Sequence, residues 1–169
     1  MDIVSHALIG RALVTSKSKK FDTYLVTAFG ALPDLFQIPL YIFVGYLHAR
    51  PFYYPLTSDW QGVRNAYPLW AALWEIPHSF FFLLLVVAPL VLLLNLNKLA
   101  ILAYALHLFV DLFTHTGEWA VKPLYPLPFL FHGFTDAWAW DVIYYPVSWA
   151  VLIVMIVVLE KLRNRGAQS

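Results

Sequence analysis

The sequence of 169 residues contains no cysteine. Thiolate metal sites, disulfide bonds and cysteine nucleophiles are therefore excluded, and any bound metal must be held by His, Asp or Glu side chains. Charged residues are also scarce, at 12% of the chain, and the net charge is only +1. Because no basic stripe exists, nucleic acid is not expected as a partner.

Apolar residues are abundant instead. They make up 61% of the chain, and the mean hydropathy is +0.67, whereas soluble domains are roughly 45–50% apolar. We therefore expect an all-α fold, a polytopic membrane helix bundle that forms a single domain over residues 1–169. The opening segment "MDIVSHALIGRALV" begins with an acid, and His6 and Arg11 interrupt its apolar run. It is therefore not a secretory signal.

Four apolar segments are predicted to span the membrane, since a span needs ~20 residues. They are residues 23–48, 68–94, 98–116 and 141–160. Residues 3–15 are predicted to form a half-helix too short to span. Pro33 and Pro39 should kink or interrupt the first span. The long connections 49–67 and 117–140 are rich in aromatic residues, which favour the membrane interface, and we expect them to lie on its outer surface as lids.

The distribution of basic residues predicts the orientation. If the four spans alternate, seven basic residues fall on one side of the membrane and three on the other. The seven are Lys17, Lys19, Lys20, Lys98, Lys161, Arg163 and Arg165, and the three are Arg50, Arg64 and Lys122. The positive-inside rule then places the C-terminus in the cytoplasm and the two aromatic loops outside.

The stretch "HLFVDLFTHTG", residues 107–117, places three ionisable side chains four residues apart on one helical stripe. The depth of a residue in the membrane can be counted from the cytoplasmic end of its segment at ~1.5 Å per residue. On this count, several segments place a His or an Asp in the middle and outer half of the membrane. These residues are His6, Asp34, His78, His107, Asp111 and His115. Each central charge costs roughly 2.5–3.5 kcal/mol, so the groups must be paired or metal-bound. The surplus of imidazoles over carboxylates favours a metal, with structural pairing, or Asp34 as a helix cap, as alternatives.

Imidazole and carboxylate ligands suit Zn²⁺, with Mn²⁺ or Fe²⁺ as alternatives. We expect two ions bridged by Asp111. Asp34, His78 and His107 would complete one shell, and His6 with Asp2 or His115 the other. Two ions ~3.5–4 Å apart can clamp the attacking and leaving oxygens of a phosphoryl transfer.

A metal-bound water, with its pKa lowered to roughly 7, would be the nucleophile. Glu75 and Glu118 are spare carboxylates near the site, and each is a candidate general base, extra ligand or surface residue. Ser79, next to His78, is predicted to donate a hydrogen bond to the site's ligands, since no G-x-S-x-G elbow supports serine catalysis.

Four motifs in order carry a family resemblance: "MDIVSH", "GALPDLF", "PHS" and "HLFVDLFTHTG". The chain resembles the LexA-regulated, membrane-bound metal-dependent hydrolase family over residues 1–128, although "WEIPHS" replaces the family's usual Arg-Gly before its "THS" element. The succession of histidines and aspartates is also similar to zinc-dependent phospholipase C. The resemblance implies a hydrolase of the bacterial or archaeal cytoplasmic membrane. It implies five metal ligands: His6, Asp34, His78, His107 and Asp111.

A site in the outer half of the membrane can receive an amphiphile sideways from the lipid. Arg50, Arg64 and Lys122 could hold its phosphate or anchor lipid headgroups. The predicted function is thus hydrolysis of a lipid phosphoester by a metal-activated water. A metal-ion channel or carrier, or a non-catalytic protein stabilised by its metal, are the alternatives. The apolar inner halves of the spans, such as "LLLVVAPLVLLL", count against transport.

Overall fold

A computed structural model describes residues 1–166, which are mostly helical and form no strand. The α-helices are α1 (Ile3–Ala12), α2 (Lys20–Phe36), α3 (Ile38–Leu47), α4 (Val63–Ala66), α5 (Pro68–Glu75), α6 (Phe80–Phe82), α7 (Ala88–Leu93), α8 (Leu99–Thr114) and α9 (Tyr144–Gly166). A π-helical turn, η3 (Leu83–Val87), joins α6 to α7. Short 3-10 turns are η1 (Pro51–Tyr53), η2 (Thr57–Trp60), η4 (Gly117–Trp119) and η5 (Ala137–Ala139). The all-α prediction is confirmed.

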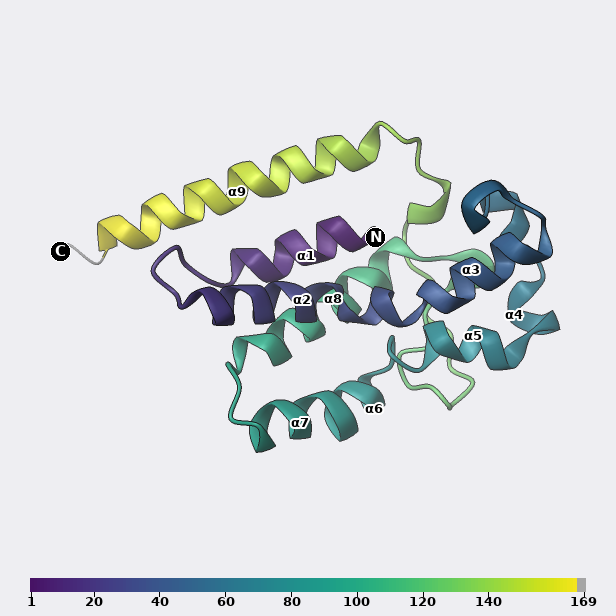
Figure 1. The fold of residues 1–169 in the computed structure, drawn as a ribbon, viewed down its shortest axis with the longest axis horizontal. Coiled ribbons are helices and arrows are strands. Elements are labelled where there is room, and N and C mark those ends of the chain that lie inside the picture. Colours follow the sequence, from purple (N-terminus) through teal and green to yellow (C-terminus); the bar gives the residue numbers. More distant parts are fainter. Residues whose placement is uncertain (167–169) are drawn as a thin grey trace.

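The helices run back and forth along one long axis (Figure 1). The turn after α1, the turn between α7 and α8, and the C-terminal end of α9 all lie at the same end of that axis. The helix formed by α2 and α3 breaks at Gln37, between Pro33 and Pro39, as the two prolines predict.

Two helices are long and apolar enough to cross a membrane, Lys20–Leu47 and Tyr144–Arg165. The four predicted spans are not confirmed. Residues 68–94 form a helix pair bent by 59°, which is either one broken span or a re-entrant loop. The helix α8 has only 16 residues, fewer than the ~20 that a span needs. By length and composition, the structure therefore supports two spans, or three if the bent pair is one.

The bend between α5 and α6 is built from specific residues. Pro77 has no backbone N–H and so cannot continue the hydrogen bonds of α5, and the Ser79 hydroxyl starts α6 by accepting a hydrogen bond from the Phe81 amide at 3.1 Å. The Pro77 carbonyl accepts a hydrogen bond from the buried Tyr104 hydroxyl at 2.6 Å. Non-helical backbone at membrane depth is tolerated only where protein or water covers it. The bend thus holds His78 inside the protein.

Two glycines bring α1 against α2. A Cβ on Gly30 would lie 2.6 Å from the His6 carbonyl oxygen, and one on Gly10 would lie 2.8 Å from the Val26 carbonyl oxygen. Only glycine permits this approach, as at the small-residue interfaces of membrane helices. His6 is therefore held next to the helix that carries Asp34.

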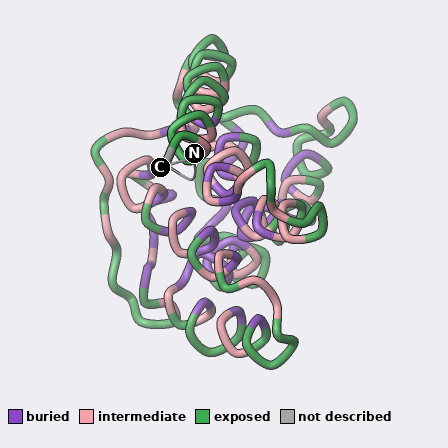
Figure 2. Tube along the Cα trace, turned by 90° about the vertical axis from the view of Figure 1, so that its left-hand side faces the viewer, coloured by how far each residue is buried: buried purple, intermediate pink, exposed green. Residues whose placement is uncertain are grey.

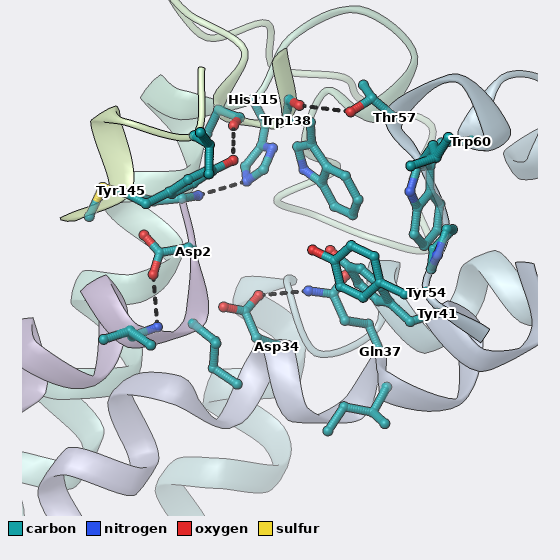
Figure 3. A pocket seen from close by; sticks show the side chains of 18 of the residues that line it. Asp2, Asp34, Gln37, Tyr41, Tyr54, Thr57, Trp60, His115, Trp138 and Tyr145 are labelled. Atoms are coloured by element: carbon teal, nitrogen blue, oxygen red, sulfur yellow. Dashed lines mark hydrogen bonds between the residues drawn. The ribbon is translucent and has the colours of Figure 1, made fainter. Parts of the chain in front are cut away.

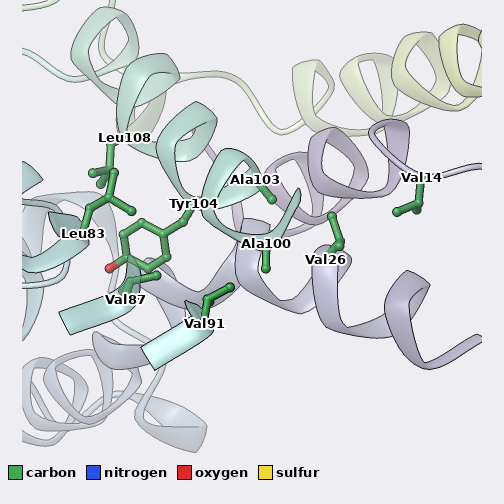
Figure 4. Packing of buried hydrophobic residues seen from close by; sticks show 9 residues of the cluster. All are labelled: Val14, Val26, Leu83, Val87, Val91, Ala100, Ala103, Tyr104 and Leu108. Atoms are coloured by element: carbon green, nitrogen blue, oxygen red, sulfur yellow. The ribbon is translucent and has the colours of Figure 1, made fainter. Parts of the chain in front are cut away.

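Two apolar clusters meet along α8. The first comprises Val14, Val26, Leu83, Val87, Val91, Ala100, Ala103, Tyr104 and Leu108 (Figure 4). The second comprises Leu40, Val44, Trp60, Val63, Trp74, Trp119 and Val121, with Leu112 packed against it. His107 and Asp111 lie on α8 where one cluster gives way to the other.

The helix α9 is exposed along most of its length (Figure 2). Only 6% of its most apolar window is buried, although its mean hydropathy is 1.8. An apolar helix with so little protein cover is suited to a lipid environment. The two aromatic loops contribute Trp60 and Trp119 to the second apolar cluster, and their place at the membrane surface stays a prediction.

Candidate metal centre

Four buried side chains converge from three segments of the chain. Asp34 comes from α2, His78 from the bend, and His107 and Asp111 from α8. One ligand atom from each lies within 4.8 Å of all the others. The spacing of four residues on α8 brings His107 Nε2 to 3.1 Å from Asp111 Oδ2, as the helical stripe predicts. The structure thus assembles four of the seven predicted metal ligands into one group.

The separations within this group match a tetrahedral ion site. The two Nε2 atoms of His78 and His107 are 3.2 Å apart. His78 Nε2 lies 3.4 Å from Asp111 Oδ2 and 3.5 Å from Asp34 Oδ1, and His107 Nε2 lies 3.8 Å from Asp34 Oδ1. Ligands at 2.0–2.2 Å from a tetrahedral zinc are separated by roughly 3.3–3.6 Å. These five separations, with the two carboxylates within 4.8 Å of each other, describe a group that could hold one divalent ion.

The other ring nitrogens fix the orientation of both histidines. His107 Nδ1 donates to the Gly30 carbonyl at 2.7 Å, and His78 Nδ1 donates to the Trp74 carbonyl at 2.6 Å. Because a carbonyl only accepts, each Nδ1 carries a proton, and each ring, when neutral, presents a lone pair at Nε2. Two facing lone pairs repel unless a proton or a metal ion lies between them. Carbonyls commonly orient metal-binding histidines in this way.

The carboxylates have hydrogen-bonding capacity to spare. Asp34 Oδ2 and Asp111 Oδ2 are buried without a hydrogen-bond partner. Gln37, which the sequence analysis did not single out, donates from Nε2 to Asp34 Oδ1 at 2.9 Å. Because Gln37 follows Asp34 by three residues at the end of a helix, the sequence could have indicated that the two side chains would meet. A buried polar atom without a partner is costly, so these two oxygens fit a divalent cation.

The second oxygen of Asp111 faces a different set of groups. Asp111 Oδ1 lies 2.9 Å from His6 Nε2, 3.4 Å from His115 Nε2 and 2.7 Å from the Met1 amine. The His6 ring stacks on the His107 ring, with centroids 3.6 Å apart. His115 reaches Asp111 from an extended residue beyond the end of α8, so it is not part of the helical stripe. His6 and His115 therefore border the four-residue group on the far side of Asp111.

Asp2 and Ser79 make other contacts. Asp2 caps α1 by accepting from the amides of Val4 and Ser5, both at 3.0 Å, and it also accepts from Trp149 Nε1 at 2.9 Å. This capping is the usual role of Asp at a helix start. The Ser79 hydroxyl donates to the Tyr125 carbonyl at 3.0 Å. The predicted roles of Asp2 as a ligand and Ser79 as a donor to the ligands are thus not seen among these contacts.

Glu75 lies in an ion-pair network. Its Oε1 accepts from Arg64 Nε at 2.6 Å and from Lys122 Nζ at 2.7 Å. Arg64 also donates to the backbone carbonyls of Glu118 and Ala120. Arg64 and Lys122, which were predicted to bind phosphate, are thus paired with a carboxylate of the protein. Neither Glu75 nor Glu118 belongs to the four-residue group. Their predicted roles stay predictions.

The third predicted phosphate cation, Arg50, pairs with Asp59. Its Nε and Nη2 each donate to one oxygen of that carboxylate at 2.7 Å. The hydrogen bonds from Arg50 lower the pKa of Asp59 from 3.8 to about 2. His48 lies 3.7 Å from the same carboxylate, on the exposed side of this pair. These residues fasten the loop that follows α3.

A cavity of about 900 Å³ lies beside the metal group. Asp34 and His115 line it, and Figure 3 shows Trp60, Trp138, Tyr41 and Tyr54 around the opposite side. No Lys or Arg is among the described residues that line it. The cavity gives Asp34 an open side, so a ligand could reach the group.

No model of a known family, no curated protein and no solved structure matches the chain. The resemblance to the LexA-regulated hydrolase family therefore depends on the four motifs alone and stays a prediction.

Proposed function

We propose that this chain is a metal-dependent membrane hydrolase, with a divalent ion held by Asp34, His78, His107 and Asp111. The observation that carries the proposal is the pair of Nε2 atoms only 3.2 Å apart, beside two carboxylates that have unpartnered oxygens. Zinc fits this mixture of imidazole and carboxylate ligands best, ahead of manganese or iron. When bound, such an ion supplies a water that is nucleophilic near neutral pH.

The residues around the ion have separable tasks in this proposal. The Gly30 and Trp74 carbonyls hold the two imidazoles in the tautomer that leaves Nε2 free. Asp34 lines the cavity, and its Oδ2 has no hydrogen-bond partner. This oxygen can accept a proton from an attacking water. Asp34 suits the role of general base better than Glu75, whose negative charge is shared between Arg64 and Lys122.

A second ion is the finer part of the proposal. Asp111 Oδ1, with His6 and His115 beside it, offers ligands on the side away from the first group. The Met1 amine, 2.7 Å from the same oxygen, would have to move to admit an ion there. Metal analysis distinguishes one bound ion from two. His6→Ala should remove about one of two equivalents if both ions bind, and a wild-type stoichiometry of one would leave only the first site.

The proposed substrate is a lipid phosphoester. The cavity is bordered by both helices that are long and apolar enough to cross a membrane. With no Lys or Arg in its lining, the phosphate would be held by the ion rather than by Arg50, Arg64 or Lys122. In this proposal those three cations keep their carboxylate partners, Asp59 for Arg50 and Glu75 for Arg64 and Lys122.

Detergent-purified protein, never exposed to chelator, tests the proposal. It should contain bound metal and hydrolyse at least one member of a panel of lipid phosphoesters, and chelator or His107→Ala should abolish the activity. His132→Ala is the matched control, because His132 lies outside the metal group. Absence of metal would contradict the proposal. Ion flux into proteoliposomes without hydrolysis would instead support the carrier alternative.

A further inference from the structure

The rim of the large cavity is apolar and exposed. Ile38 at the start of α3, Val4 on α1 and Val142 just before α9 all line the cavity. Their exposed fractions are 46%, 41% and 77%. In water this rim would be an unfavourable apolar surface, whereas in a bilayer it faces hydrocarbon. The opening between α3 and the start of α9 is therefore suited to lipid contact.

Polar and apolar groups occupy different parts of the lining. Asp34, Gln37, Asp2 and His115 lie toward the metal group, whereas aliphatic and aromatic side chains form most of the remaining wall (Figure 3). Among the described residues, the charged groups of the lining are the carboxylates of Asp2 and Asp34 and the N-terminal amine of Met1. The arrangement matches an amphiphile whose polar end lies at Asp34.

The size of the cavity limits what it can enclose. Its volume of about 900 Å³ falls near the upper end of the ~300–1,000 Å³ typical of small-molecule sites. It can hold a polar end and part of one chain, with the rest of the molecule left in the bilayer. An open apolar rim is the feature that such partial enclosure requires.

We propose that the hydrocarbon chain of an amphiphile enters this cavity sideways from the bilayer, through the opening between α3 and the start of α9. The identity of the polar end as a phosphoester rests on the proposed function. Binding of the hydrocarbon chain does not rest on the proposed function. Of the four residues of the metal group, only Asp34 lines the cavity, and it lies away from the exposed rim and the aromatic wall. The two ideas can therefore fail separately.

Two isoleucines of α3 provide a matched test. Ile38 and Ile42 are 46% and 50% exposed, but only Ile38 lines the cavity. Because the chain has no cysteine, Ile38→Cys and Ile42→Cys each create a single thiol. Each thiol is modified with a bulky uncharged maleimide, and the protein is reconstituted in phosphatidylcholine with brominated chains. Four of the seven tryptophans line the cavity, so bromine quenching of tryptophan fluorescence reports chain entry.

Modification at position 38 should cause a loss of quenching, whereas modification at position 42 should leave quenching at the unmodified level. Chelator should change neither result, since chain binding needs no ion. Equal effects at both positions would overturn the inference, even in a protein that hydrolyses phosphoesters. If modification at position 38 instead lowers quenching by aqueous iodide and leaves bromine quenching unchanged, the mouth of the cavity faces water. That result would also overturn the inference. A loss at position 38 in a protein without hydrolytic activity would support the inference and count against the proposed function alone.

Discussion

Replacing Asp111 with Asn tests the metal centre most directly. Asp111 is fully buried, and its Oδ2 lies 3.1 Å from His107 Nε2 and 3.4 Å from His78 Nε2. Asn keeps the shape but removes one of the two negative charges that balance a divalent ion. Removing one partner of a buried charge pair costs about 3–5 kcal/mol. Metal affinity should therefore fall about 140- to 3,700-fold, at 1.4 kcal/mol for each factor of ten.

Thermal unfolding in detergent, at a free metal concentration of about 100 times the wild-type Kd, measures this loss. The bound ion should stabilise the wild-type protein by about 2.7 kcal/mol, which raises the midpoint by about 5–11 °C for a chain of this size. Asp111→Asn should retain at most about 0.4 kcal/mol of that stabilisation. The control is Asp59→Asn, which changes another buried Asp outside the metal group and should keep the full shift. An equal metal-dependent shift in Asp111→Asn would refute the reasoning.

Three further outcomes are expected. A cysteine at Lys19 should be shielded from an impermeant thiol reagent in intact cells and one at Thr135 should react, and the reverse pattern would contradict the orientation. Gly30→Ala should cost about 1–3 kcal/mol of stability, because its Cβ would lie 2.6 Å from a backbone oxygen of α1; an unchanged midpoint of thermal unfolding would argue against that close packing. Because the pKa of Asp59 is lowered to about 2, its pair with Arg50 stabilises the fold fully above about pH 4 and loses this effect as the pH falls through 2. The difference in unfolding midpoint between the wild-type protein and Arg50→Gln should therefore be present at pH 5 and vanish near pH 2, and a difference that persists at pH 2 would assign it to another cause.

The parts of the site that follow from local geometry could be predicted from the sequence. Residues four apart on a helix share a face, so His107 and Asp111 were expected to lie together, and they do. Apolar composition likewise predicted helices suited to a membrane, and two are confirmed. Asp2 carried a second local signal, because an Asp directly before a helix is commonly its cap, and Asp2 does cap α1; its role as a metal ligand stays a prediction.

Contacts between distant segments could not be predicted. Glu75 pairs with Arg64 and with Lys122, which is 47 residues away in the chain, and no periodicity encodes that choice. Where residues 68–94 divide into two helices, the Tyr104 hydroxyl donates to the Pro77 carbonyl from another helix. A hydropathy pattern records only that such a segment is apolar, so it cannot tell a straight span from a bent one.

The packing of Trp74 against His78 has a practical consequence. The indole and imidazole rings stack with centroids 4.9 Å apart and planes 24° from parallel. An excited indole so close to a coordinated imidazole would be sensitive to the electronic character of the ion. Cobalt or copper, whose partly filled d shells quench nearby fluorophores, should dim Trp74, whereas zinc with its filled shell should not. If the proposed ion binds, Trp74 would thus be a built-in optical reporter of its loading in an intact bilayer, seen as a change against the signal of the six other tryptophans.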